Sequence, residues 1–182
     1  MGASRNPTAR KRAPTTALLS RYKSWRLFLK QKYATVGTSP RVEDRLVHRV
    51  NVTHFFPFPA ERVFQAWLDQ DTVGEWLFAT PEGEMIEVAL NPKVGGSYRI
   101  VERREDGDIL HTGVYERIDA PHDLEFTFSV PKYDPGSVHV HIHIASTSGG
   151  CELNLTHEVE EQWLKPSTHG WQTILSNLEA TL

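Results

Sequence analysis

Apolar and polar residues alternate along most of the chain from residue 46 onward, which is typical of half-buried β-strands. Pro57 ends the first run, because proline cannot donate to a ladder, and Asp106-Gly107 is the strongest hairpin signal among the later ones. The first run places Leu46, His48, Val50 and Val52 on one face. The later predicted strands are 84–90, 97–104, 109–118, 123–130, 137–146 and 150–158. Their short connections predict one seven-stranded antiparallel sheet.

Three other segments carry the three- and four-residue apolar spacing of helices. Two short helices are predicted after the first strand, one opened by Pro59 and one capped by Asp69. A long amphipathic helix ends the chain, with Pro166 in its first turn. The apolar stripes are Val63, Phe64, Trp67 and Leu68 in the first helix, Val73, Trp76 and Leu77 in the second, and Trp171, Ile174, Leu175, Leu178 and Leu182 in the third.

A sheet and a helix that each have one apolar face hide both faces by packing together. The sequence therefore predicts an α+β domain whose seven-stranded antiparallel sheet wraps around the long C-terminal helix. The two short helices would close one end of the curved sheet. We expect such a sheet to leave an internal cavity beneath the helix.

The charge distribution separates an arm from this domain. The 182 residues carry a net charge of −3, but residues 1–40 hold nine Arg or Lys and no acidic residue. We therefore expect residues 1–45 to form a basic flexible arm, with an amphipathic helix at 18–33, and residues 46–182 to form the domain. The acidic domain argues against nucleic acid and anionic lipid as partners, because both require a basic face.

The same residues bear on cellular location. No stretch approaches the length of a transmembrane helix, and the single cysteine, Cys151, suits a reducing compartment. We predict a cytoplasmic protein. Targeting to an organelle through the basic arm is the alternative, because an acid-free amphipathic start is typical of presequences.

Short motifs accompany the order of one strand, two short helices, six strands and one long helix. They are Pro59–Trp67 (PAERVFQAW), Glu75-Trp76, Val94–Arg99 (VGGSYR), Gly113–Glu116 (GVYE), Pro121, Leu124–Thr127 (LEFT), Leu155–His157 (LTH) and Gly170-Trp171. In this order they resemble the helix-grip fold of the SRPBCC superfamily, which includes START-like lipid carriers. The nearest resemblance is to the C-terminal domain of activators of the ninety-kilodalton heat-shock protein ATPase. Many relatives carry a double tryptophan and Gly-Pro where this chain has Trp76–Pro81 (WLFATP), so the loop at the cavity mouth differs.

Strand parity selects the side chains that would line the cavity. Tyr115 is ambiguous, because Val114 and Ile118 compete with it for the inner face. The predicted ligand-binding residues are Trp76, Phe78, Tyr98, Ile100, Tyr115, Phe126, Phe128, Leu155, His157 and Trp171. A large apolar pocket with a few polar groups is the usual small-molecule site, although the same residues would fill any packed core.

Catalytic and metal-binding motifs are weak. There is no phosphate-binding loop or nucleophile elbow, and His157, Glu102, Tyr115 and His111 are only general acid or base candidates. Glu102 could instead pair with a neighbouring arginine. His139, His141 and His143 alternate with Val138, Val140, Ile142 and Ile144, so we expect the histidines to face solvent. No acidic partner for them is evident from the sequence, and we predict neither a metal nor another cofactor.

Three functions are therefore consistent with the sequence. The preferred one is binding of a hydrophobic small molecule between the sheet and the terminal helix. The resemblance implies a second, association with a heat-shock chaperone in a stress response. The third is a small cavity enzyme of the cyclase or hydrolase type, for which no catalytic residue is assigned.

Overall fold

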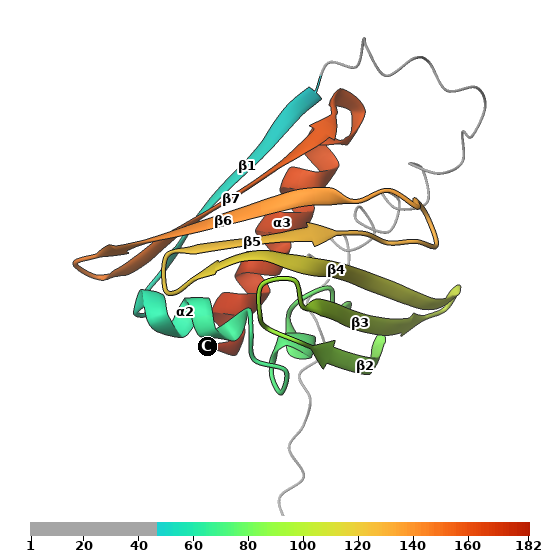
Figure 1. Cartoon of the computed structure of the whole chain (residues 1–182), viewed down its shortest axis with the longest axis horizontal. Coiled ribbons are helices and arrows are strands. Elements are labelled where there is room, and N and C mark those ends of the chain that lie inside the picture. Colours follow the sequence, from blue (N-terminus) through green and yellow to red (C-terminus); the bar gives the residue numbers. More distant parts are fainter. Residues whose placement is uncertain (1–46) are drawn as a thin grey trace, which may run out of the picture.

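The computed structural model describes residues 47–182, in which seven antiparallel strands curve around one long helix (Figure 1). The strands lie in the order β1-β7-β6-β5-β4-β3-β2. Their bounds are β1 Val47–Phe56, β2 Glu84–Leu90, β3 Ser97–Arg104, β4 Gly107–Asp119, β5 Asp123–Phe128, β6 Val138–Thr147 and β7 Gly150–Glu160. This arrangement confirms the predicted helix-grip α+β fold, with β1 joining the sheet beside the last strand.

The C-terminal helix α3, Glu161–Thr181, passes behind the strands in Figure 1 and packs on β1 and β7. Trp171, Leu175 and Leu178 are buried on its inner face, as the apolar stripe predicted. The predicted start was wrong, because the helix begins at Glu161 and Pro166 lies inside it. Residues 161–165 continue directly from β7, and burial of Trp163 fixes this additional turn.

The two short helices follow β1 as predicted. Helix α2, Ala60–Ala66, has Pro59 as its N-cap residue, and η2, Val73–Glu75, is a single 3-10 turn. Asp69 was predicted to cap the second helix, but Thr72 occupies that position. Asp69 instead accepts hydrogen bonds from the Asp71 amide at 3.0 Å and the Thr72 hydroxyl at 2.8 Å, so it stabilises the preceding turn.

A bulge in β4 settles which residue of that strand faces the interior. The register with β5 shifts between Tyr115 and Arg117. Tyr115 is therefore buried, Val114 is 39% exposed and Ile118 is partly buried. An extra residue in one strand shifts the alternation of inward and outward side chains by one position. Tyr115 before the bulge and Ile118 after it therefore both point inward.

Gly113 on β4 allows two neighbouring strands to hold Tyr98. A Cβ atom at Gly113 would lie 1.7 Å from the Thr127 carbonyl oxygen and 2.8 Å from Tyr98 Cε1. The Tyr98 hydroxyl donates to that same carbonyl at 2.9 Å. Only glycine leaves room for this contact beneath the sheet.

The predicted arm, residues 1–45, and its helix at 18–33 lie outside the described residues. The division into an arm and a domain therefore stays a prediction. Within residues 47–182, the longest helix is not apolar enough to cross a membrane.

Candidate ligand-binding site

The structure places eight of the ten predicted cavity residues in two separate groups and the other two, Trp76 and Leu155, outside both. Nine of the ten are buried, and Phe128 is half-buried. Tyr98, Ile100, Tyr115 and Phe126 form one group, and Phe78, Phe128, His157 and Trp171 form the other. Trp76 instead packs edge-on against Trp67, with ring centroids 4.8 Å apart, and Leu155 lies within the core.

The first group surrounds a very small cavity. Its volume is about 10 Å³, near the minimum for one water molecule. Trp67, Leu77, Leu90 and Leu124 complete its wall. Aromatic and aliphatic side chains therefore fill most of the space that the sequence analysis expected to be open here.

The second group is a stack of rings beneath α3. Phe78 lies parallel to His111, with centroids 4.3 Å apart, and to Phe128, with centroids 5.0 Å apart. Trp171 presents its edge to both phenylalanines, at 6.3 and 6.2 Å, and His157 lies 6.0 Å from Trp171. We call Phe78, His111, Phe128, Trp171 and His157 the ring cluster.

His111 is the unusual member of the ring cluster. Its side chain is fully buried on β4, and neither ring nitrogen has a hydrogen-bond partner among the described residues. Burial, with a smaller contribution from Arg104, lowers the pKa of His111 to about 3; a weak contact with the Ile100 carbonyl opposes the shift. The imidazole is therefore neutral at physiological pH, and neither ring nitrogen makes a hydrogen bond of normal geometry with the described residues.

A buried ion pair on β3 holds the chain next to Phe78. The Glu102 carboxylate accepts hydrogen bonds from the Thr80 amide, the Thr80 hydroxyl and Arg104. Both charged side chains are buried, with 7% of Arg104 and 1% of Glu102 exposed. The Arg104 guanidinium also donates to the Phe78 carbonyl at 3.4 Å. The pairing of Glu102 with an arginine fits the sequence alternative, whereas Thr80 and Arg104 were not predicted.

Phe78 has a strained backbone. Its φ is 62°, and it is the one non-glycine residue of 47–182 with positive φ. A bulky side chain in this region costs roughly 1–3 kcal/mol and persists only where its surroundings enforce it. The contacts of Arg104 and Glu102 with residues 78 and 80 provide that restraint. No pattern in the sequence indicated this strained backbone at Phe78.

The tyrosines of the first group are hydrogen-bond donors rather than bases. Burial raises the pKa of Tyr115 to about 12, and burial with the neighbouring Tyr115 raises the pKa of Tyr98 well above its ordinary value. Their rings lie 5.8 Å apart. Both phenols stay protonated at physiological pH, so neither is ready to remove a proton.

The four acid or base candidates are not assembled as a catalytic group by these contacts. Glu102 bonds to Thr80 and Arg104, and His157 Nδ1 lies 3.2 Å from the Glu158 carbonyl. Neither contact joins one candidate to another.

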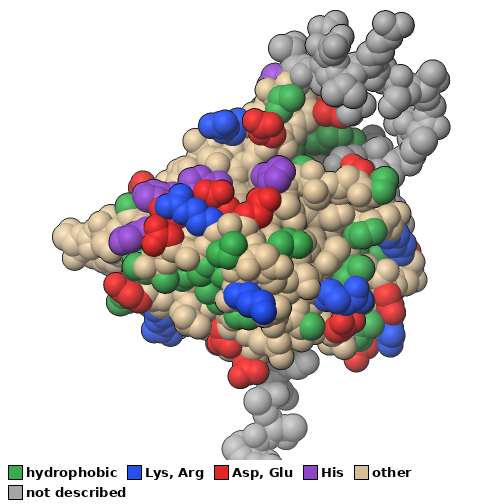
Figure 2. Space-filling model, in the orientation of Figure 1, with side chains coloured by type: hydrophobic (Ala, Val, Ile, Leu, Met, Phe, Trp, Pro, Cys, Tyr) green, Lys and Arg blue, Asp and Glu red, His purple; other side chains and the backbone are tan. Residues whose placement is uncertain are grey.

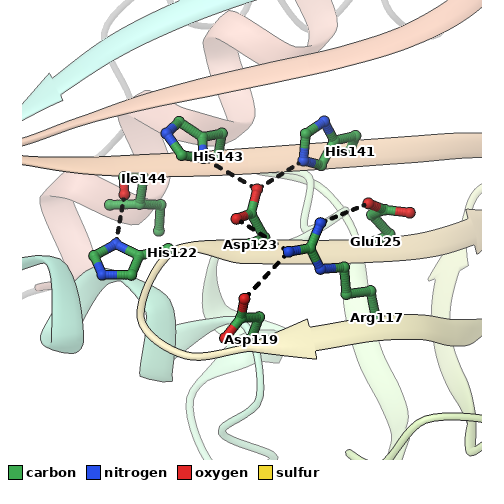
Figure 3. A network of polar contacts seen from close by, with 8 residues as sticks. All are labelled: Arg117, Asp119, His122, Asp123, Glu125, His141, His143 and Ile144. Carbon is green, nitrogen blue, oxygen red and sulfur yellow. Dashed lines mark hydrogen bonds and ion pairs between the residues drawn. The ribbon is translucent and has the colours of Figure 1, made fainter.

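The outward-facing histidines lie on the opposite side of the sheet. His139, His141 and His143 point away from the buried Val140, Ile142 and Ile144, as predicted. Figure 2 shows histidine and acidic side chains gathered on this face. The sequence made no acidic partner evident, but the structure supplies them: His139 contacts Glu116, and both other histidines contact Asp123 (Figure 3). Strand pairing brings these carboxylates in from β4 and β5.

Comparisons with known proteins agree with this fold. The sequence profile of a family described as Activator of Hsp90 ATPase homolog 1-like protein matches residues 57–182. A protein of unknown function from Staphylococcus aureus has a TM-score of 0.68 and 19% identity, over 78% of this chain and 96% of that one. The AHSA1-like protein from Aeromonas hydrophila has a TM-score of 0.64 and 26% identity, over 74% and 91%. No curated protein matches the chain.

Proposed function

Since this chain belongs to the family of activator of Hsp90 ATPase homolog 1-like proteins, we propose that it binds a small ligand between α3 and the sheet, at the ring cluster. The ligand is mainly apolar or aromatic, because it would take the place of the Phe78 ring beside Phe128 and Trp171. It carries one uncharged hydrogen-bonding group, such as a hydroxyl or a carbonyl, that contacts His111.

The observation that carries this proposal is the lack of hydrogen bonds at His111. Leaving a buried polar group without a partner costs about 1–3 kcal/mol, and such groups in native proteins call for an explanation. A ligand group would supply the missing partner. The lowered pKa of His111 keeps the imidazole neutral, which favours an uncharged partner over a carboxylate.

Ligand entry requires side chains to move, because the Phe78 ring stacks on His111 and Phe128 with centroids only 4.3 and 5.0 Å apart. The Phe78 ring is the one that would have to move, since it covers His111; Arg104 and Glu102 hold the backbone of residues 78 and 80 but not this ring. An aromatic ligand would replace the Phe78 ring between His111 and Trp171. The segment from Phe78 to Thr80, held by Arg104 and Glu102, would then act as the entrance.

A matched pair of probes tests this proposal. 1-Naphthol and naphthalene share an apolar body, but only 1-naphthol carries a hydroxyl. Titration calorimetry on the full chain should show saturable binding of both, with 1-naphthol roughly 2- to 10-fold tighter, as expected for one hydrogen bond. Substitution His111→Leu should remove this difference, whereas His139→Leu on the opposite face should not. Failure of the wild-type chain to bind either probe would exclude the proposal.

Association with a heat-shock chaperone is a separate prediction that rests on the family relationship. It would be tested by measuring the ATPase rate of the purified chaperone with and without this chain. An unchanged ATPase rate together with no detectable complex would exclude association with the chaperone. That result would leave the small-molecule proposal standing, because that proposal also depends on the ring cluster and on the buried imidazole of His111.

A further inference from the structure

A groove separate from the ring cluster lies between the short helix α2 and the last turn of α3, which are side by side in Figure 1. Its volume is about 310 Å³. Small-molecule sites span about 300–1,000 Å³, so this groove suits a small ligand. We call it the α2–α3 groove. None of the residues that line it belongs to the ring cluster, so the two sites are independent.

Trp76 lies at the base of the α2–α3 groove and has an unused hydrogen-bond donor. Its side chain is fully buried, and its Nε1 atom has no hydrogen-bond partner among the described residues. The edge-to-face contact with Trp67, at 4.8 Å between ring centroids, offers at most a weak N–H···π interaction. A buried donor without an acceptor costs about 1–3 kcal/mol and calls for an explanation. A ligand oxygen in the groove would supply the acceptor.

Arg62 places a positive charge on the wall of the groove. Its guanidinium lies over the Phe58 ring, 4.8 Å from the centroid, and donates a hydrogen bond to the Leu182 carbonyl. These two contacts hold the guanidinium in position. Because the group has five N–H donors in a planar fork, it retains donors that match a carboxylate.

Asp69 places a negative charge on the same wall, seven positions further along the chain. Seven residues of helix rise about 10 Å, so the two charges are well separated. The Asp69 carboxylate is held by the Asp71 amide and the Thr72 hydroxyl, one at each oxygen. An ionised carboxylate has about four lone-pair positions, which leaves room for an ammonium group.

The groove is apolar between these charges. Ala66 lies between Arg62 and Asp69 in the chain, and Leu178 lines the groove from α3. A hydrocarbon segment would remove these side chains from water. The order of the wall is therefore a cation, an apolar stretch and an anion, and a complementary ligand has the opposite charges at its two ends.

We propose that the α2–α3 groove binds a small zwitterion whose carboxylate and ammonium are joined by a short hydrocarbon chain, as in an ω-amino acid. The carboxylate binds Arg62 and accepts the hydrogen bond of Trp76 Nε1. The ammonium binds Asp69, and the methylene groups lie against Ala66 and Leu178. The separation of Arg62 and Asp69 favours this class over α-amino acids, in which the two charges are adjacent.

Titration calorimetry of the full chain with 6-aminohexanoate, hexanoate and hexylamine tests this site. 6-Aminohexanoate should bind saturably, and the other two probes, which each lack one charged group, should bind about tenfold more weakly. Arg62→Gln should weaken 6-aminohexanoate about tenfold and leave hexylamine unchanged. Asp69→Asn should weaken it equally and leave hexanoate unchanged. Trp76→Phe, which removes the N–H group, should also weaken 6-aminohexanoate about tenfold.

Arg49→Gln and Asp71→Asn are the matched controls, because they make the same changes at residues that do not line the groove. Both should leave the affinity for 6-aminohexanoate within about twofold.

Two results would overturn the proposal. One is the absence of saturable binding of 6-aminohexanoate by the wild-type chain. The other is an affinity that Arg62→Gln, Asp69→Asn or Trp76→Phe leaves within about twofold, because the ligand would then be held elsewhere, for example at the ring cluster. Arg62 is exposed, so the effect of Arg62→Gln does not depend on how well Trp76→Phe folds.

Discussion

Arg104 on β3 donates a hydrogen bond to the backbone carbonyl of Phe78, 26 positions earlier in the chain, at 3.4 Å. The contact links a buried charge to the residue whose backbone is strained. Because Glu102 holds Thr80 at the same time, the ion pair restrains both sides of Ala79. The charged pair thus fixes the backbone that carries the Phe78 ring, which stacks on His111.

Breaking this ion pair should destabilise the fold strongly. Arg104→Met leaves the Glu102 charge buried without its partner, and such a change costs about 3–5 kcal/mol. Combining it with Glu102→Leu removes both charges and should recover at least half of the loss. Urea unfolding, with linear extrapolation to water, measures these free energies.

The neighbouring exposed pair provides the control. Arg103 contacts Asp108 at 2.9 Å, but both side chains face solvent. Arg103→Met should leave the unfolding midpoint almost unchanged, because solvent screens exposed ion pairs. Equal losses in Arg103→Met and Arg104→Met would contradict the role given to burial.

Gly113→Ala should also destabilise the domain. The added methyl group meets the Thr127 carbonyl at 1.7 Å, and the backbone must shift to accept it. Overpacking of this kind costs roughly 1–3 kcal/mol, and here it also disturbs the Tyr98 hydrogen bond. Gly149→Ala is the control, because its nearest contact would be 3.8 Å from Phe55. Thermal unfolding of the two variants compares them directly, and a stable Gly113→Ala protein would contradict the argument.

Much of the fold follows from local patterns in the sequence. Alternation predicted the strands, since one face of each is buried, and the Asp106-Gly107 turn occurs where β3 and β4 meet. Tyr115 stayed ambiguous, because a bulge changes the number of residues between inward positions without a clear sequence signal. The start of α3 was misplaced, since Pro166 is tolerated inside a helix that continues from β7.

The candidate sites depended on contacts between distant residues, which the sequence does not specify. The inward direction of Phe78 and Trp171 was predicted, but whether their rings leave or fill a cavity depends on packing in three dimensions. Asp123 was not recognised as a partner of His141 and His143, because that contact requires the register of β5 against β6. Likewise, nothing local indicated that Arg104 reaches Phe78.

Removal of residues 1–40 should leave the thermal midpoint of the domain nearly unchanged. These residues carry nine basic and no acidic side chains, in contrast to the acidic remainder, which favours a separate arm. Differential scanning calorimetry of the full and truncated chains gives the comparison. A large loss of stability on truncation would show instead that the arm packs on the domain.

His111 should make stability depend on pH between about 3 and 6.5. Its pKa falls to about 3 in the folded chain because burial disfavours the charged imidazole, whereas an unfolded histidine titrates near 6.5. Between these values the unfolded chain binds the additional proton, so the free energy of unfolding decreases as the pH falls.

Substitution His111→Leu isolates this contribution, because every other titrating group is retained. The wild-type chain should lose about 2–3 kcal/mol more than His111→Leu between pH 7.5 and pH 4.5, as the linkage relation gives for pKa values of about 3 and 6.5. Urea unfolding at both pH values measures the difference, with His139→Leu as an exposed control. Parallel losses in wild-type and His111→Leu proteins would show that the imidazole is hydrated or already charged in the folded state.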